Sequence, residues 1–322
     1  MRGLRPKILV VGSLHMDLTV KAETIPRIGE TLLGKEFKMA PGGKGANQAV
    51  AAAKLGSDVT IVGRVGADFY GDRLIENAEH YGINTEFVVR DPETYTGIAL
   101  IMVDKKGNNI ISVAQGADSR CTIEDVDKAE NTLRTSSVLL VQLEIPISVV
   151  EYAMRKASYY GVRTILNPAP AHKLSKRIMH DAFILTPNER EAELLSGLRI
   201  TDTDSARKAA KRIVEEGTRN VVLTIGKKGA ILATREEVVR VPAPRVKAID
   251  TTGAGDAFCA ALAVSVSSGR NLKESVGFAN WAGAYATTKV GAQEALPSLK
   301  ELRRFMYERI RFKRCVSVVE KR

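Results

Sequence analysis

The stretch Asp250-Thr251-Thr252-Gly253-Ala254-Gly255-Asp256 constrains this chain most, because it joins a glycine turn to an apolar, alanine-rich segment of helical character. The residues before the turn are β-rich and predict a strand that ends near Ile249. The two glycines lack a Cβ, so the backbone can adopt unusual φ angles and a ligand can come close. The first N–H groups of the predicted helix have no intrahelical partner and form an anion site. Asp256 at this helix end is suited to accept a proton from an attacking alcohol, although an aspartate that only caps a helix would look alike.

A second glycine-rich stretch, Pro41-Gly42-Gly43-Lys44-Gly45-Ala46-Asn47-Gln48, also opens a predicted helix. Lys44 and Asn47 are three residues apart and therefore share one face of its first turn. Backbone N–H groups, an ammonium and an amide together suit a polyhydroxyl ligand. The GxxxxGK[ST] spacing of a P-loop is absent from the sequence.

A third polar stretch, Gly12-Ser13-Leu14-His15-Met16-Asp17, follows the first predicted strand. It places His15 and Asp17 at the carboxyl end of that strand. A carboxylate at this position can bind adjacent hydroxyl groups, whereas a turn-forming aspartate is the plainer alternative.

The fold class follows from short β-branched runs that alternate with longer amphipathic segments. Strands separated by helices of this length predict right-handed βαβ units and a mostly parallel sheet with helices on both faces, a three-layer α/β/α domain. We predict strands at 7–11, 58–63, 138–143, 163–166 and 220–224, and helices at 43–55, 70–81, 148–160 and 204–216.

Two regions break this alternation. Glu30–Met39 reads as a strand, and Thr96–Ala114 reads as a hairpin around Lys105-Lys106-Gly107-Asn108. We expect strands from about 14–40 and 96–115 to pair as a small β lid over the carboxyl edge of the main sheet, where it would exclude water. An antiparallel extension of the main sheet is the alternative.

Composition excludes several other classes of protein. The chain of 322 residues carries a net charge of +11, but residues 300–322 alone contribute +6, so we interpret 300–322 as a basic C-terminal helix or tail on a domain that spans 1–299. Basic and aromatic residues do not cluster, which disfavours nucleic acid as a partner. No apolar run approaches the roughly 18 residues of a transmembrane helix, and the three cysteines form no CxxC pair. We expect a cytoplasmic protein without a membrane partner.

The motifs together resemble one known family. The Gly-Gly-Lys-Gly-Ala-Asn-Gln and Asp-Thr-Thr-Gly-Ala-Gly-Asp segments, with Gly-Ser-x-x-x-Asp at the first strand and Pro187-Asn188-Glu189-x-Glu191, resemble the ribokinase branch of the PfkB-type sugar kinases. The resemblance covers about residues 7–299 in motif order. It implies an ATP-dependent sugar kinase with a ribokinase-like fold, Mg²⁺, stimulation by K⁺, and a homodimer formed through the β lid.

The resemblance also implies roles for individual residues. Asp256 would be the base, with the N–H groups of Gly253, Ala254, Gly255 and Asp256 as the anion hole. The sugar would be bound by residues of the stretch after the first strand, of the second glycine-rich stretch and by two later acids: His15, Met16, Asp17, Gly42, Gly43, Lys44, Gly45, Asn47, Glu144 and Asp256. The nucleotide and its Mg²⁺ shell would contact Asn188, Glu191, Thr224, Gly226, Gly229, Gly255 and Asn280. The potassium site would use Asp250, Thr252, Ala286, Lys289, Gly291 and Ala295.

Two positions depart from the family pattern. His15 stands where ribokinases commonly have asparagine, and Ala295 stands where a serine often completes the cation site. We expect phosphorylation of D-ribose at O5. The alternatives are a kinase for another sugar or a nucleoside (2-deoxyribose, fructose or an adenosine-type substrate), which His15 motivates, and a sugar-binding regulator without catalysis.

Overall fold

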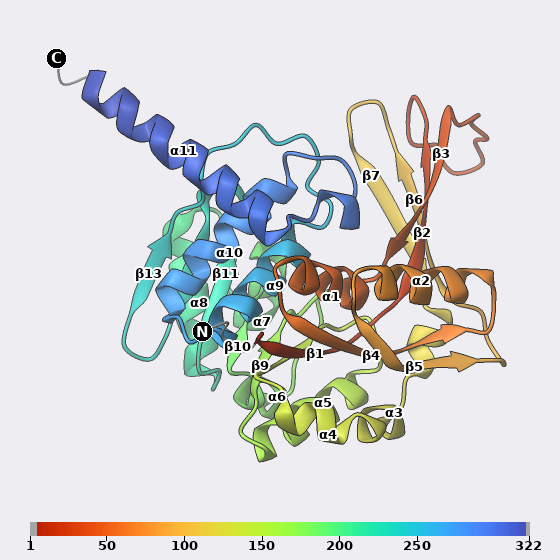
Figure 1. The fold of residues 1–322 in the computed structure, drawn as a ribbon. Coiled ribbons are helices and arrows are strands. Elements are labelled where there is room, and N and C mark those ends of the chain that lie inside the picture. The colour runs from red at the N-terminus through yellow and green to blue at the C-terminus, as the bar shows by residue number, and fades with distance from the viewer. Residues whose placement is uncertain (1–4, 320–322) are drawn as a thin grey trace.

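A nine-stranded sheet forms the centre of the molecule (Figure 1), in the order β13-β12-β11-β10-β9-β8-β1-β4-β5. The computed structural model describes residues 5–319, with side chains described as far as Arg311; residues 1–4 of the predicted domain and 320–322 of the predicted tail lie outside this range. The parallel strands are β1 (Lys7–Val11), β4 (Asp58–Gly66), β5 (Asn84–Asp91), β8 (Val138–Val141), β9 (Arg163–Leu166), β10 (Ile184–Leu185) and β11 (Val221–Thr224). β12 (Ala230–Ala233) and β13 (Val238–Val241) continue the sheet in antiparallel fashion.

Helices cover both faces of this sheet, because successive side chains of a buried strand point to opposite sides. Ile8 and Val10 of β1 pack in one apolar cluster, and Leu9 and Val11 pack in the other. The first cluster includes α1 (Lys44–Lys54), α2 (Phe69–His80), α9 (Ala254–Ser267) and α10 (Leu272–Ala286). The second includes α3 (Ile123–Lys128), α4 (Glu130–Thr135), α5 (Ile147–Tyr159), α6 (Lys176–Asp181), α7 (Glu189–Ser196) and α8 (Thr203–Glu215). The predicted three-layer α/β/α architecture is confirmed.

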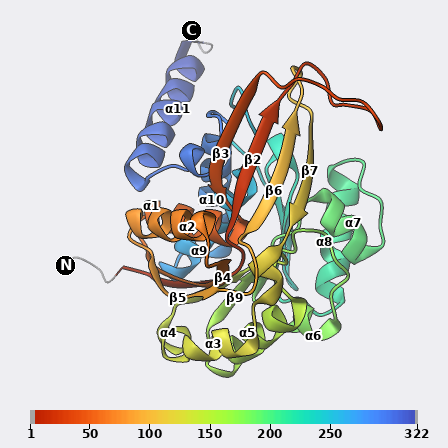
Figure 2. The same cartoon turned by 90° about the vertical axis from the view of Figure 1, so that its right-hand side faces the viewer.

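Four further strands form a separate small sheet, in the order β3-β2-β6-β7. They are β2 (His15–Lys21), β3 (Glu36–Gly42), β6 (Gly97–Val103) and β7 (Asn109–Ala114). β2 pairs in parallel with β6, and the outer strands pair antiparallel to them. Figures 1 and 2 show this sheet standing away from the main one. The alternative that these strands extend the main sheet is therefore wrong.

Two predicted strand boundaries are also wrong. Residues 30–35 are not in a strand: β3 begins at Glu36, which pairs with Lys21, the last residue of β2, so the preceding residues have no ladder partner. The β-rich run before the glycine turn does not reach Ile249, since β13 ends at Val241. Pro242 and Pro244 follow it and lack the N–H that a ladder needs.

The chain ends in the long helix α11 (Leu299–Val319), which projects from the body in Figure 1. Its first turns are anchored: Leu302 is buried, and the Phe305 ring meets Trp281 and Tyr285 edge-on, with ring centroids 5.9 and 5.1 Å apart. Tyr285 therefore belongs to the core of the domain, and Trp281 packs against that core. Across residues 5–319 no helix combines the length and apolarity needed to cross a membrane.

Candidate active site

Asp256 lies in the first turn of α9, which begins after Gly253 at φ +71°. Its carboxylate is buried and accepts two side-chain hydrogen bonds from α1, one at each oxygen. Gln48 Nε2 donates to Oδ1 at 3.0 Å, and Asn47 Nδ2 donates to Oδ2 at 3.1 Å. The packing of α1 against α9 thus joins the two glycine-rich stretches that the sequence singled out.

A chain of amides fixes the orientation of these two donors. Gln142 Nε2 donates to Gln48 Oε1 at 2.7 Å, and Gln48 Nε2 also reaches Asn167 Oδ1 at 3.1 Å. Gln293 Nε2 donates to Asn47 Oδ1 at 3.1 Å. Because each oxygen is already an acceptor, the amide NH₂ groups must face the carboxylate. Sequence reasoning left Gln48, Gln142, Asn167 and Gln293 without a role; buried amides in otherwise apolar segments were the available signal.

Burial raises the pKa of Asp256, which makes its carboxylate a stronger base than a solvated aspartate. Lys44 is the nearby cation. Burial acts to lower the pKa of Lys44, but the charges of Asp256, Glu144 and Glu191 outweigh it and raise that pKa, so the ammonium stays charged. The site therefore holds a basic carboxylate beside a permanent positive charge.

The start of α9 offers backbone donors beside this carboxylate. Within the described part of the chain, the N–H groups of Gly255 and Asp256 have no acceptor, whereas Ala254 N donates to Thr251 O at 3.2 Å. A Cβ built on Gly255 would meet no protein atom within 4 Å, so this residue faces open space. Of the four predicted anion-hole residues, Gly253, Gly255 and Asp256 thus have N–H groups without an acceptor in the described residues, and Ala254 does not.

The predicted sugar-binding residues gather around Glu144, just beyond β8. Its Oε2 accepts from Ser13 Oγ at 2.5 Å and from Lys44 N at 2.9 Å, and so ties the end of β1 to the start of α1. Gly42 faces Asp17 so closely that a Cβ would lie 2.2 Å from Asp17 Oδ1. Met16 points the other way, because neighbouring residues of a strand face opposite sides of the sheet.

Gly43 and Gly45 permit this close approach. Gly43 precedes α1 at φ +90°, and a Cβ on Gly45 would lie 2.6 Å from the backbone of Gly12 and Ser13.

We expect Gly45→Ala to lower the free energy of unfolding by about 1–3 kcal/mol, the usual cost of overpacking, measured by urea denaturation. The matched control is Gly277→Ala in α10, where the added methyl meets no atom within 4 Å. Equal stability of the two variants would contradict the expected steric conflict.

His15 occupies the first position of β2 between two acids. Its Nδ1 lies 3.3 Å from Asp118 Oδ2, and its Nε2 lies 3.6 Å from Asp17 Oδ1. Asp118 belongs to the 3₁₀ helix η1 (Gly116–Arg120), and its Oδ1 also accepts from Leu14 N at 2.8 Å. Sequence reasoning missed Asp118, since it lies 104 residues from Leu14 and belongs to no recognised motif.

The predicted nucleotide-binding residues lie at the next strand ends of the sheet. Asn188 and Glu191 form a capping box at the start of α7. The backbone of Asn188 also forms an isolated parallel β-bridge with Thr224 at the end of β11. Gly226 (φ +52°) and Gly229 (φ +102°) bound the 3₁₀ helix η2 (Gly226–Lys228). Asn280 is buried in α10 and donates through Nδ2 to Val241 O at 2.9 Å, so this donor already has a structural partner.

Two of the predicted cation-site residues, Thr252 and Gly291, donate hydrogen bonds to Asp250. Its Oδ1 accepts from Thr252 N and Thr252 Oγ1, and its Oδ2 accepts from Gly291 N at 2.9 Å. Lys289 O, Gly291 O and Ala295 O accept no backbone hydrogen bond in the described residues, whereas Ala286 O already accepts from Lys289 N. A carboxylate with free carbonyl oxygens is the kind of donor set that a hard cation prefers. Ala295 can offer only its carbonyl, from the 3₁₀ helix η3 (Gln293–Ala295).

A divalent metal would have few protein ligands here. Between residues 5 and 319, no three His, Cys, Asp or Glu side chains are grouped as a metal site. Burial raises the pKa of Glu191, which is near Lys44 and accepts a hydrogen bond from Asn188 Nδ2 at 2.7 Å. This fits Mg²⁺, which proteins commonly hold through one or two side chains and the phosphates of a substrate.

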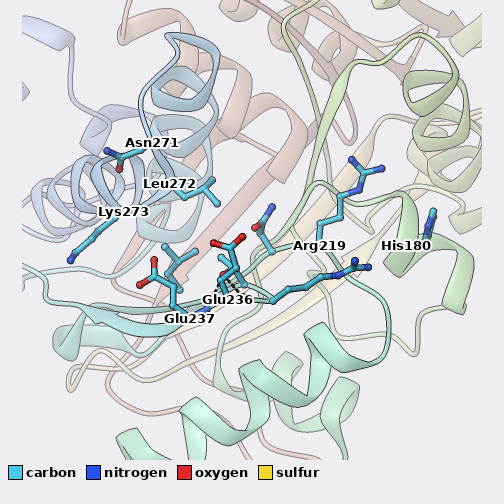
Figure 3. A pocket seen from close by; sticks show the side chains of 11 residues that line it. His180, Arg219, Glu236, Glu237, Asn271, Leu272 and Lys273 are labelled. Atoms are coloured by element: carbon cyan, nitrogen blue, oxygen red, sulfur yellow. Dashed lines mark hydrogen bonds between the residues drawn. The ribbon is translucent and has the colours of Figure 1, made fainter.

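One hollow of the surface lies elsewhere. It measures about 810 Å³ and is lined by residues at the amino ends of β10 and β11, including His180, Arg219 and Asn220 (Figure 3). Asn188, Thr224 and the start of α9 belong to the opposite, carboxyl edge. Ligands of open α/β sheets bind at the carboxyl edge, so the cluster around Asp256, and not this hollow, is the candidate active site.

Comparisons with known proteins agree with this geometry. The family model described as "pfkB family carbohydrate kinase" matches residues 5–299. The chain is 40% identical to a deoxyribokinase of Salmonella typhi, over 93% of this chain and 98% of that one. It is 37% identical to a ribokinase of Staphylococcus aureus, over 92% of this chain and 98% of that one. The structure of Arabidopsis thaliana ribokinase complexed with ribose and ATP superposes with a TM-score of 0.85 and 30% identity, over 94% and 99% of the two chains.

Proposed function

Since the chain belongs to the pfkB family of carbohydrate kinases, we propose that it transfers the γ-phosphoryl group of ATP to O5 of D-ribose, with Asp256 as the base. It is a ribokinase-type sugar kinase, and its family implies ATP and a divalent metal. The observation that carries the proposal is the buried Asp256 carboxylate, oriented by Asn47 and Gln48 beside the free N–H groups at the start of α9.

In the proposed reaction, each bond formed or broken and the transferred proton are accounted for. The sugar O5 forms a bond to the γ-phosphorus, the bond from that phosphorus to the bridging oxygen breaks, and ADP leaves. Asp256 takes the O5 proton. The N–H groups of Gly255 and Asp256 and the Lys44 ammonium stabilise the negative charge on the transferring group, which dominates catalysis of phosphoryl transfer. Mg²⁺ would neutralise phosphate charge near Glu191.

We also propose a monovalent cation beside Asp250. Asp250 and Thr252 precede the anion-binding turn directly, and Asp250 is bound to Gly291 N. A K⁺ ion on the free carbonyl oxygens of Lys289, Gly291 and Ala295 would stabilise the turn that carries Gly255. K⁺ would then raise kcat rather than sugar affinity.

A second candidate substrate is 2-deoxyribose. One relative at 40% identity is a deoxyribokinase, and His15 lies beside Asp17 in the predicted sugar site. ADP release should therefore be measured with ATP·Mg²⁺ and a panel of D-ribose, 2-deoxyribose, fructose and nucleosides, with and without K⁺. Fast turnover on ribose supports the first proposal, and preference for 2-deoxyribose or a nucleoside moves the substrate. Binding without turnover would favour a regulator.

The small sheet suggests a homodimer. The strand pairing places Leu18, Val20, Phe37, Met39, Leu100, Met102 and Ile110 on one apolar face, opposite to the face of Asp17. Phe37 and Leu100 are 60% and 56% exposed. Contiguous exposed apolar surface of this kind marks an interaction site. We propose that the same face of a second copy covers it.

We expect Leu100→Glu to convert the dimer to a monomer, because it would bury charges in the interface. Sedimentation analysis across a concentration series measures the change. Leu198→Glu is the control, since Leu198 is exposed (41%) but lies outside the small sheet. A wild-type monomer, or a Leu100→Glu dimer of unchanged affinity, would refute the proposed interface.

A further inference from the structure

Asp118, His15 and Asp17 form a row at the edge of the candidate sugar site, in which Asp118 and His15 are buried and Asp17 is half-buried. The contacts run from Asp118 Oδ2 to His15 Nδ1 at 3.3 Å, and from His15 Nε2 to Asp17 Oδ1 at 3.6 Å. Asp118 and His15 are 1% and 5% exposed. Space for the row depends on Gly97, where a Cβ would lie 2.7 Å from Asp118 Oδ2 and 2.9 Å from His15 Cβ. The row is thus built into the junction of η1, β2 and β6.

We propose that Asp118 is a positioning residue of the sugar site, which holds His15 as an imidazolium so that His15 Nε2–H and the Asp17 carboxylate together select a sugar hydroxyl. A carboxylate oxygen faces each ring nitrogen, so both nitrogens favour a proton. The 3.6 Å between Nε2 and Oδ1 is too long for a good hydrogen bond. A hydroxyl between them would accept from Nε2–H and donate to Asp17.

The charges around the row support this protonation state. His15 faces Asp17 on its own strand, Asp118 from η1 and Glu144 from the end of β8, and Asp17 also faces Lys44 from α1 and Asp256 from α9. Burial lowers the pKa of His15, but the hydrogen bond to Asp118 and the negative charges outweigh it and raise that pKa to about 9. Burial raises the pKa of Asp17 and of Asp118 to about 6.

Below about pH 6 the two aspartates take up protons, and above about pH 9 His15 loses its proton. The hydroxyl-binding pair is complete only between these limits, so sugar affinity should be highest there and fall on both sides. That the ligand of this pair is a sugar rests on the proposed sugar kinase function. The charged state of Asp118, His15 and Asp17 does not depend on that function.

The test compares wild type with Asp118→Asn, His15→Asn and the double variant. The amide introduced by Asp118→Asn keeps an acceptor for Leu14 N but removes the charge that faces His15. In proton NMR titrations without sugar, His15 should titrate near pH 9 in wild type, and Asp118→Asn should lower its pKa to the ordinary value near 6.5 or below. Asp127→Asn, which removes a carboxylate of α3 that contacts Lys156, is the control.

Sugar binding and turnover supply the second measurement. At pH 8, Asp118→Asn should weaken ribose binding by about 10- to 100-fold, the usual worth of a charged hydrogen bond, and raise KM far more than it lowers kcat. The alkaline fall in affinity should move toward pH 7. In the His15→Asn background the Asp118→Asn change should have little further effect, because Asp118 acts through His15.

Each outcome decides the proposal. An ordinary pKa for His15 in wild type, or an Asp118→Asn effect of equal size in the presence and absence of His15, would overturn it. A raised His15 pKa that Asp118→Asn abolishes, without turnover on any sugar, would support the charged row while refuting the proposed kinase function.

Discussion

Replacing Asp256 with asparagine is expected to lower kcat by about 10²–10⁴-fold, the range for a positioned general base, while ribose and ATP still bind. The amide has the shape of the carboxylate but cannot take the O5 proton. The NH₂ group of the new asparagine will face the NH₂ group of Asn47 or Gln48, so one hydrogen bond is lost. A modest loss of stability should therefore accompany the change. Single-turnover ADP formation measures the rate, and calorimetry measures binding of each substrate.

The control for this experiment must separate chemistry from folding. Gln48→Glu is unsuitable, because it would place a second carboxylate beside Asp256. Asn271→Ala, which removes the side-chain cap of α10 far along the chain, costs about 0.5–2 kcal/mol of stability without touching the site. If Asp256→Asn turns over at the wild-type rate, Asp256 is not the base. If both variants lose activity in parallel with stability, the effect is one of folding.

Gly255→Ala is expected to lower kcat by about 10²-fold with no loss of stability. The added methyl meets no protein atom within 4 Å, and alanine favours a helix over glycine. It would instead occupy the space that the transferring phosphoryl group needs, and a misplacement of about 1 Å can cost this much in rate. Thermal unfolding and steady-state kinetics on the same preparation separate the two effects.

Gly277→Ala provides the comparison, since it adds the same methyl group to a helix glycine with open space around it. It should match wild type in rate. Full activity of Gly255→Ala would show that no ligand atom comes near this residue, and the anion hole would have to lie elsewhere. A cooperative loss of stability in Gly255→Ala would show that the turn itself had been disturbed.

The elements that sequence patterns predicted best are those whose signals are local. The strand Arg163–Leu166 and the helix over 43–55 were predicted almost to the residue, because periodicity, glycine stops and β-branched runs act over short distances. The strand predicted over Glu30–Met39 is observed only from Glu36, and the strand predicted to end near Ile249 ends at Val241, since a strand also needs a partner. The ladder ends where β2 ends at Lys21, and where Pro242 follows β13.

The main chemical groups of the candidate site could be identified from the sequence, because the two glycine-rich stretches and Asp256 form local motifs whose residue types indicate anion binding and proton transfer. Only the tertiary structure decided what holds them. Gln48 lies 208 residues from Asp256, and Asp118 lies 103 residues from His15, yet each pair is in contact. No local pattern encodes such a pair, because its geometry arises when α1 packs on α9 and when η1 packs against β2. The sequence alone therefore determined the kind of reaction, and the packing of distant segments determined the orientation and charge of the groups proposed to perform it.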